Sequence, residues 1–179
     1  MAVSGSTNFE PDITEFIEEA YERCGLELRT GYDLKSAIRS ANFMLAEWAN
    51  RGLNQWTITT GTQTVTKGTN SYDLGTDVID VLDVVVRRTV NGTTTDIRLD
   101  KLSRSEFFSI PNKATEARPS QYFIDKQNNP KIFVYPTPEN STDVIRFNKL
   151  SRLDDADDAK NTMDIPFRFY PCFAAGLAY

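Results

Sequence analysis

Residues 33–52 read DLKSAIRSANFMLAEWANRG, and this stretch organises the rest of the chain. Its apolar side chains recur every three or four residues, so they share one face of a helix with about 3.6 residues per turn. They are Leu34, Ala37, Ile38, Ala41, Met44, Leu45 and Trp48. Asp33 is suited to cap the helix, and Gly52 is suited to end it in a left-handed conformation. We therefore predict an amphipathic helix whose apolar face is buried against another element.

The partner for that face is expected in the preceding residues. Asp12 and Glu15 are spaced as a capping box, in which each side chain accepts a hydrogen bond from the backbone N–H of the other residue. Apolar residues follow at helical spacing as far as Cys24, and Gly25 is expected to end the helix. The connection to the next helix is short, so residues 12–53 are predicted to form an antiparallel helical hairpin. Residues 1–11 are expected to be a flexible N-terminal arm.

Composition limits the class of protein. The chain of 179 residues has room for one domain, or for one domain with an insertion. Hydrophobic residues make up 40% and charged residues 25%, as is typical of folded soluble proteins. Lysine and arginine number 20 against 25 acidic residues, a net charge of −5. This balance argues against tight binding of duplex DNA through its phosphates, although DNA could pass along an acidic wall without adhering.

The chain contains 0 histidines and 2 cysteines. Without histidine there is no Ser-His-Asp or Cys-His nucleophile system and no His-ligated zinc. Cys24 and Cys172 are predicted to be small core residues and not a disulfide, because nothing else indicates secretion. The N-terminal residues lack a basic patch followed by an apolar stretch, and no run approaches the roughly 20 apolar residues of a membrane span. We expect neither a signal peptide nor a membrane segment. We expect the protein to be made in a cytoplasm.

The pattern changes from helical to alternating in residues 54–150. This region is predicted to be an inserted antiparallel β domain of roughly six to eight short strands with one short helix. Trp56–Thr60 and Gln63–Thr66, separated by Gly61, are expected to form a hairpin or an edge pair. Val78–Arg87 is the most strand-like run and is expected to be buried on both faces near its end.

Two local signals add detail to this β region. Asn91-Gly92 predicts a two-residue hairpin turn between flanking strands. Ser103 and Glu106 are spaced as a second capping box, which predicts a short helix that Pro111 stops.

Residues 151–163 are predicted to be an acidic linker. Their LDDADDAK sequence has closely spaced aspartates, but it lacks the glycine and the late glutamate of a calcium loop. Residues 164–179 are predicted to be a C-terminal helix that packs on the hairpin, with Asp164 at the cap, Pro166 in the first turn and a kink at Pro171. The apolar helical run still continues at Tyr179, so we expect more protein or a partner to follow. The predicted fold class is therefore α+β, with a C-terminal helix completing a helical bundle.

No motif for chemistry is present. The sequence lacks a glycine-rich phosphate loop, a nucleophile elbow and a cluster of Cys or His, so we assign no catalytic, cofactor-binding or metal-binding residue and expect no enzyme. Four glutamates on the polar face of the first helix are interpreted as a solvated face and not a catalytic pair. They are Glu15, Glu18, Glu19 and Glu22. The aromatic residues Trp56, Phe107, Phe108 and Tyr122 are either interface anchors or core residues.

Four stretches resemble one family in order and spacing. EFIEEAYERCGLELRTGYDLKSAIRSANFMLAEWANRGLNQWTI, residues 15–58, resembles the opening helical hairpin of head-to-tail adaptor proteins of short-tailed bacteriophages, also described as head-completion, tail-accessory or packaged-DNA-stabilisation proteins. The other three are SRSEFFSIPNKATEARPSQYFID at 103–125, IFVYPTPE at 132–139 and DIPFRFYPCFAAGLAY at 164–179.

The resemblance implies a dodecameric ring of identical subunits in the virion, between the portal and the tail nozzle or tail tube. In such a ring the helices form the bundle and the β insertion faces outward or toward tail components. The ring seals packaged double-stranded DNA and later conducts it out, without sequence-specific binding. Family members usually have a further helix and a C-terminal arm that grips the portal, and this sequence departs from that pattern by stopping at Tyr179.

An unclosed helical hairpin suits repeated contacts in a closed ring. We expect Tyr32, Arg39, Arg51 and Trp56 near these contacts, as a hypothesis about the subunit interface. Two alternatives remain open. One is another neck or tail ring, such as a head-closure or tail-terminator protein. The other is an adaptor that hydrolyses peptidoglycan, which needs two carboxylates about 5–9.5 Å apart; no pair is nominated from the sequence.

Overall fold

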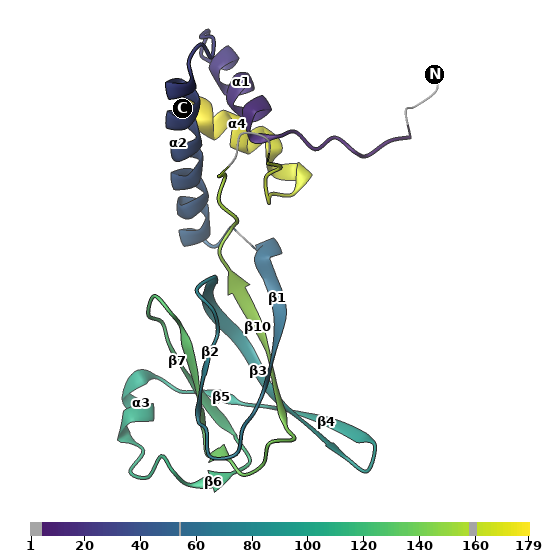
Figure 1. Ribbon diagram of the computed structural model, residues 1–179, viewed down its shortest axis with the longest axis vertical. Helices are drawn as coiled ribbons and strands as arrows, with labels where there is room; N and C mark the ends of the chain where they lie inside the picture. Colours follow the sequence, from purple (N-terminus) through teal and green to yellow (C-terminus); the bar gives the residue numbers. More distant parts are fainter. Residues whose placement is uncertain (1–4, 54, 158–160) are drawn as a thin grey trace. The chain divides into compact units, whose positions relative to one another are not determined.

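The predicted α+β fold class is confirmed by a computed structural model that describes residues 5–53, 55–157 and 161–179 (Figure 1). Parts of three predicted segments lie outside the described residues: residues 1–4 of the arm, Asn54 at the start of the β region, and residues 158–160 of the linker. The chain divides into two compact units. The helical unit contains the described residues up to Trp56 and from Leu153 onward, and the β unit is Thr57–Arg152.

The helical hairpin begins with α1 (Ile13–Arg23), which forms where its capping signal predicts. The Glu15 backbone N–H donates to Asp12 Oδ1 and the Asp12 N–H donates to Glu15 Oε2, both at 3.0 Å. This reciprocal capping satisfies N–H groups that have no partner within the helix. Gly25 has φ of +71° just beyond the helix, so the predicted end is also confirmed.

The second helix, α2 (Gly31–Asn50), runs in the opposite direction to α1 (Figure 1). It begins earlier than predicted, because Thr30 and not Asp33 is the cap. Thr30 Oγ1 accepts from the Asp33 N–H at 3.2 Å and donates to Asp33 Oδ2 at 2.7 Å. Threonine and aspartate are both good caps, so the sequence pattern did not choose between them. Gly52 ends the helix as predicted, with φ of +72°.

The C-terminal helix starts later than predicted. A 3-10 turn, η2 (Phe167–Phe169), precedes α4 (Tyr170–Ala178). Pro171 lies in the first turn of α4, where a missing N–H costs nothing, so the predicted kink is wrong. α4 packs against both α1 and α2 and completes the bundle, as predicted.

The linker contributes to the helical core. Leu153, Ala156 and Met163 are buried, so this segment is more than a solvated connection. The Asn42 side chain in α2 donates to the Ala156 carbonyl at 3.1 Å and accepts from the Ala156 N–H at 2.8 Å. This pair of hydrogen bonds holds the backbone of the linker against α2.

Both cysteines are exposed, so the prediction that they are core residues is wrong, although both are free thiols as expected. Cys24 follows the last turn of α1, beyond the buried part of its apolar stripe, and its Sγ lies 3.1 Å from the Ala178 carbonyl oxygen. Cys172 faces outward because Phe173 and Ala174 take the buried positions of α4.

The β unit consists mainly of two four-stranded sheets whose buried side chains form one core. The first is antiparallel, in the order β1 (Ile58–Thr64), β10 (Val144–Ser151), β3 (Val78–Val90) and β4 (Thr93–Arg98). The second has the order β2 (Ser71–Asp73), β8 (Lys131–Tyr135), β7 (Gln121–Asp125) and β5 (Asp100–Lys101), with β5 parallel to β7. A short parallel pair joins β6 (Glu116–Ala117) to β9 (Thr137–Pro138).

Two predicted local features of the β unit are confirmed. Asn91 and Gly92 both have positive φ, +50° and +78°, and connect β3 to β4 as a tight hairpin. The capping box of Ser103 and Glu106 opens α3 (Arg104–Ser109). The pKa of Glu106 is lowered because its carboxylate accepts a hydrogen bond from the Ser103 backbone N–H.

Of the two arrangements predicted around Gly61, the hairpin is wrong, and the residues instead lie in a strand at the edge of its sheet. Gly61 lies within the continuous strand β1 and is paired with Phe147 of β10. A Cβ at position 61 would lie 2.5 Å from Phe147 Cε2, so glycine is required by the close approach of an aromatic ring and not by a turn.

The strand β3 is also not buried on both faces as predicted. Val84 and Val86 are fully buried, but Val85 between them is only half-buried. The ladder with β10 shifts register beside Leu82, which pairs with no residue of β10, so the run from Val78 to Val86 does not alternate simply.

A buried ion pair joins β3 to the start of β10. The Asp143 side chain is 2% exposed and accepts from Arg88 Nη2 at 2.7 Å and from Arg88 Nε at 2.9 Å. Arg88 also donates to Glu139 Oε1 at 2.9 Å. These hydrogen bonds to Asp143 and Glu139 raise the pKa of Arg88, so its guanidinium group stays protonated.

We expect Gly61→Ala to lower the free energy of unfolding of the β unit by about 1–3 kcal/mol, because Phe147 must move within a packed core. Both tryptophans lie in the helical unit, so urea denaturation should be followed by far-UV circular dichroism. Thr62→Ala, at an exposed position of the same strand, is the matched control and should change stability by less than about 0.5 kcal/mol. Equal stability of the two variants would contradict the role given to Gly61.

We expect Asp143→Ala to destabilise the β unit by about 1–3 kcal/mol, because the partly buried Arg88 keeps only Glu139 as an acidic partner. The control is Asp96→Ala, which removes the exposed Arg87–Asp96 pair and should cost less than about 1 kcal/mol. Amide hydrogen exchange in β3 and β10 should speed up in the first variant only. Similar protection in both variants would show that the buried pair is not important for stability.

Candidate functional site

The long helix α2 carries a second stripe on the side opposite its buried face. Tyr32, Arg39 and Phe43 are seven and four residues apart, which aligns them along one side of a helix. Tyr32 is 77% exposed and Phe43 is 70% exposed. Lys35 lies beside them and is also exposed. We call these four residues, Tyr32, Lys35, Arg39 and Phe43, the α2 stripe.

The charges of the α2 stripe are uncompensated within the part of the chain that the structure describes. Arg39 Nη2 donates to Ser36 Oγ at 3.3 Å and forms no ion pair there, and neither does Lys35. Nearer the end of the same helix, Arg51 is ion-paired with Glu47. The stripe therefore presents two free cations between two exposed aromatic rings.

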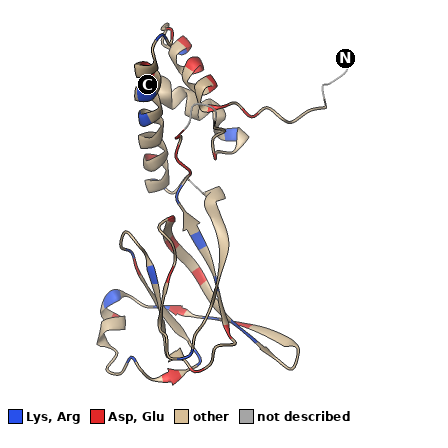
Figure 2. Ribbon diagram, viewed as in Figure 1, with Lys and Arg blue, Asp and Glu red and all other residues tan. Residues whose placement is uncertain are grey.

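The outer side of α1 has the opposite charge. Its four glutamates, the α1 acidic face, are Glu15, Glu18, Glu19 and Glu22, and all are exposed. Glu19 is paired with Arg23 at 2.7 Å, and Glu15 takes part in the helix cap. Among the described residues, Glu18 and Glu22 form no ion pair. Figure 2 shows acidic residues along α1 and basic residues on α2.

A groove of about 360 Å³ borders the α1 acidic face, between α1 and α4. Its walls are largely aromatic and prolyl, with charged residues of α1 at the rim. The lining residues are Phe9, Pro11, Glu15, Phe16, Glu19, Arg23, Tyr170, Pro171 and Ala174. Such a surface suits an apolar or aromatic side chain.

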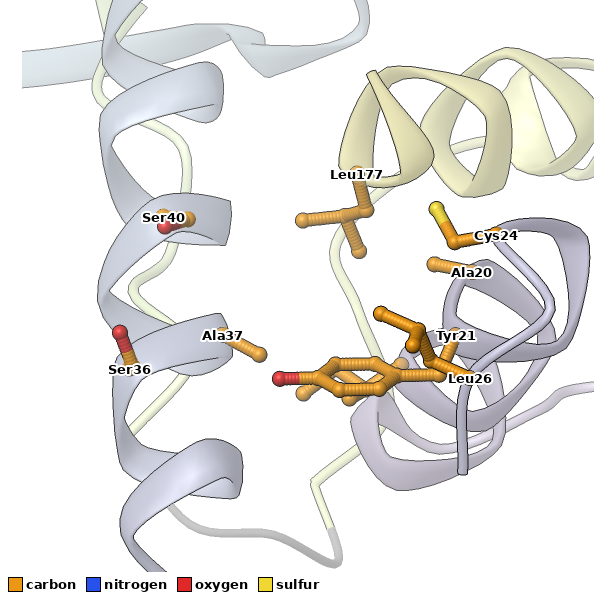
Figure 3. Close-up of a pocket in the computed structure, with 9 residues that line it drawn as sticks. Ala20, Tyr21, Cys24, Leu26, Ser36, Ala37, Ser40 and Leu177 are labelled. Carbon is orange, nitrogen blue, oxygen red and sulfur yellow. The ribbon is translucent and has the colours of Figure 1, made fainter. Parts of the chain in front are cut away.

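Two further grooves lie beside α2. One, of about 240 Å³, separates Ser36, Ala37 and Ser40 of α2 from side chains of α1 and its following loop, with Leu177 projecting into it (Figure 3). The Tyr21 ring points across this groove toward Ala37. The other, of about 540 Å³, runs between α2 and α4 and is lined in part by Phe43, Trp48 and Tyr179.

The structure separates the predicted interface residues into two groups. Tyr32, Arg39, Arg51 and Phe108 are accessible, and Phe108 is 63% exposed. Phe107 and Tyr122 are buried, and Trp56 is half-buried and packs against the helical core.

Trp56 and Phe107 have specific partners. Trp56 Nε1 donates to the Asp164 carbonyl at 3.0 Å, and its ring lies 4.8 Å from that of Phe169. Phe107 is 5% exposed and stacks on Phe123, with ring centroids 5.3 Å apart. Both rings therefore stabilise the fold. This agrees with the second alternative given for them, that they are core residues and not interface anchors.

Phe43 was not among the residues predicted from the sequence to lie at an interface. The signal was present, because Phe43 is the one aromatic residue of stretch 33–52 that falls outside the apolar stripe. It was missed because only residues on the stripe were considered as apolar surface. An aromatic residue on the polar face of an amphipathic helix is a candidate contact residue.

Within the described ranges, no cluster of three or more His, Cys, Asp or Glu side chains could hold a metal ion. None of the described helices is both long and apolar enough to cross a membrane. Asp164 is the one group of the helical unit with a resolved pKa shift among those described: burial, together with the charge of Asp154, raises its pKa. The features that distinguish the candidate site are therefore its surface shape and its charge.

No curated protein matches the sequence. A protein family does match it, described as SU10 adaptor protein, over residues 12–179. The match covers both units and confirms the resemblance to phage head-to-tail adaptors found in the sequence. The chain therefore belongs to the SU10 adaptor protein family and is a structural head-to-tail adaptor of a bacteriophage virion.

Proposed function

We propose that this chain is the subunit of a homo-oligomeric ring that joins the portal to the tail, seals packaged DNA and forms part of the ejection channel. The observation that supports it best is the pair of unlike surfaces on the helical unit. The α2 stripe is cationic and aromatic, whereas the α1 acidic face is anionic. Two different patches on one subunit suit head-to-tail contacts, which close into a ring when the rotation allows.

The partners of this ring are the portal on one side and the tail nozzle or tail tube on the other. Family membership supports an adaptor in the virion neck, and the resemblance suggests twelve copies. Subunits are made in the host cytoplasm. In the β unit, the exposed Phe108 on α3 is a candidate contact for a tail component.

Double-stranded DNA passes through the ring without sequence-specific binding. The net charge of −5 supports this, because a channel wall that is rich in acidic groups does not hold phosphates. A structural role without catalysis agrees with the family. Hydrolysis of peptidoglycan has no observation in its favour, and a turbidity assay on cell-wall material would detect it.

We expect this protein to form a ring on its phage's portal, as measured by electron microscopy and native mass spectrometry of the protein alone and with the portal. A monomer that becomes a ring on the portal supports the proposal. Phe173→Ala is the negative control, because truncating this fully buried ring should cost about 3–5 kcal/mol and disrupt the helical unit.

Other outcomes separate the alternatives. A ring that forms alone and ignores the portal would favour a head-closure or tail-terminator protein. A protein that neither binds the portal nor forms a ring would overturn the adaptor function.

A further inference from the structure

We infer that neighbouring copies in the ring contact each other through the α2 stripe of one copy and the α1 acidic face of the next. This inference rests on the proposed ring and names the surfaces that build it. It commits to a second copy of this chain as the occupant of both surfaces. Three observations support that choice: charge, spacing and shape.

The charges are complementary and available. Lys35 and Arg39 on the α2 stripe lack an ion-pair partner within the described residues, and so do Glu18 and Glu22 on α1. Their attraction strengthens as a contact excludes water, because the effective dielectric constant falls. Within one copy these groups lie on the outer sides of their helices, so each set is open to a partner.

The spacing of the charges also agrees. Lys35 and Arg39 are four residues apart, and so are Glu18 and Glu22. Four residues of helix span about 6 Å, so two helices lying side by side can form both ion pairs at once. One possible ion pair would not fix how the two helices align. Two pairs with equal spacing define one alignment of α2 against α1 of the next copy.

The shape of the neighbouring groove completes the match. Tyr32 and Phe43 flank the cations of the α2 stripe, and both rings are largely exposed. The groove of about 360 Å³ between α1 and α4 includes Glu15 and Glu19 of the acidic face in its lining. An aromatic ring from the α2 stripe can therefore enter this groove while the adjacent charges pair. Aromatic side chains buried beside charge pairs are typical of strong interface contacts.

DNA is a weaker candidate for the α2 stripe. Two free cations release few counterions, whereas tight binding of duplex DNA depends on many phosphate contacts. The acidic face on the neighbouring helix α1 would also repel a phosphate backbone. A second copy offers the missing carboxylates at the right spacing.

The test uses two charge-reversed full-length proteins. The first, Lys35→Glu with Arg39→Glu, places acidic groups at the pairing positions of both surfaces. The second, Glu18→Lys with Glu22→Lys, places basic groups at the pairing positions of both surfaces. Each alone should assemble at least about tenfold less well than wild type under the conditions in which wild type forms rings, because every contact brings like charges together. An equimolar mixture should recover assembly as rings that alternate the two proteins, with an even number of subunits by native mass spectrometry.

A matched control carries the same change in charge elsewhere. Arg29→Glu with Arg98→Glu removes two exposed ion pairs, Arg29–Glu27 and Arg98–Asp83, that belong to neither surface. This protein should assemble as wild type does. Circular dichroism and thermal midpoints of all variants should match wild type to within a few degrees, since the substitutions are at exposed positions. Phe43→Ser should also fold normally and should assemble about tenfold less well or worse.

The outcomes separate this contact from the proposed ring. If wild type forms rings and either reversed protein forms them equally well, the contact is wrong and the ring stands. A mixture that stays unassembled also overturns the contact. If the first protein forms normal rings but changes only DNA retention, the α2 stripe faces DNA and the contact is overturned. If wild type forms no ring alone or on the portal, the proposed function fails first and the contact with it.

Discussion

The helical unit depends on the burial of Phe173. Its ring is fully buried, 5.1 Å from the ring of Phe16 in α1 and 6.0 Å from that of Trp48 in α2. A two-helix hairpin buries one face of each helix only in part, so the C-terminal helix must return to complete the core. Because α4 completes the core, the exposed rings of Tyr32 and Phe43 are not needed to fill it. Their exposure makes the α2 stripe a candidate contact surface.

The two sides of α2 therefore have separate roles. One side of α2 packs on the core through Ala41 and Leu45, and the opposite side presents aromatic and basic residues. The family gives the class of protein, a bacteriophage head-to-tail adaptor. A structural protein of this kind acts through its contacts with other subunits. Its function is therefore argued from the charge, exposure and groove shape of its surfaces. The unlike charges on α1 and α2 are the features on which the proposed ring rests.

The β unit obtains its order from contacts between strands far apart in the sequence. Gly61 of β1 lies on Phe147 of β10, and the Arg88–Asp143 pair joins β3 to the start of β10. Both contacts involve β10, which lies between β1 and β3 in its sheet. A central strand that is fixed on both sides leaves little freedom of register, since a slip by one residue would expose the core face. The β unit is thus specified by packing more than by strong local signals.

The sequence by itself determined the features that depend on neighbouring residues. Both capping boxes, the Asn91-Gly92 hairpin and the amphipathic period of α2 are each set within a few residues, so they were predicted correctly. Only the tertiary structure decided the role of Gly61, the exposure of the cysteines, and which of Phe107 and Phe108 is buried. These properties depend on which distant segment packs against the residue, and one side of a helix or strand looks the same in sequence whether a core or a second copy covers it. The position of Phe43 outside the apolar stripe could be seen in the sequence, but only the tertiary structure decided that no other part of the described chain buries it.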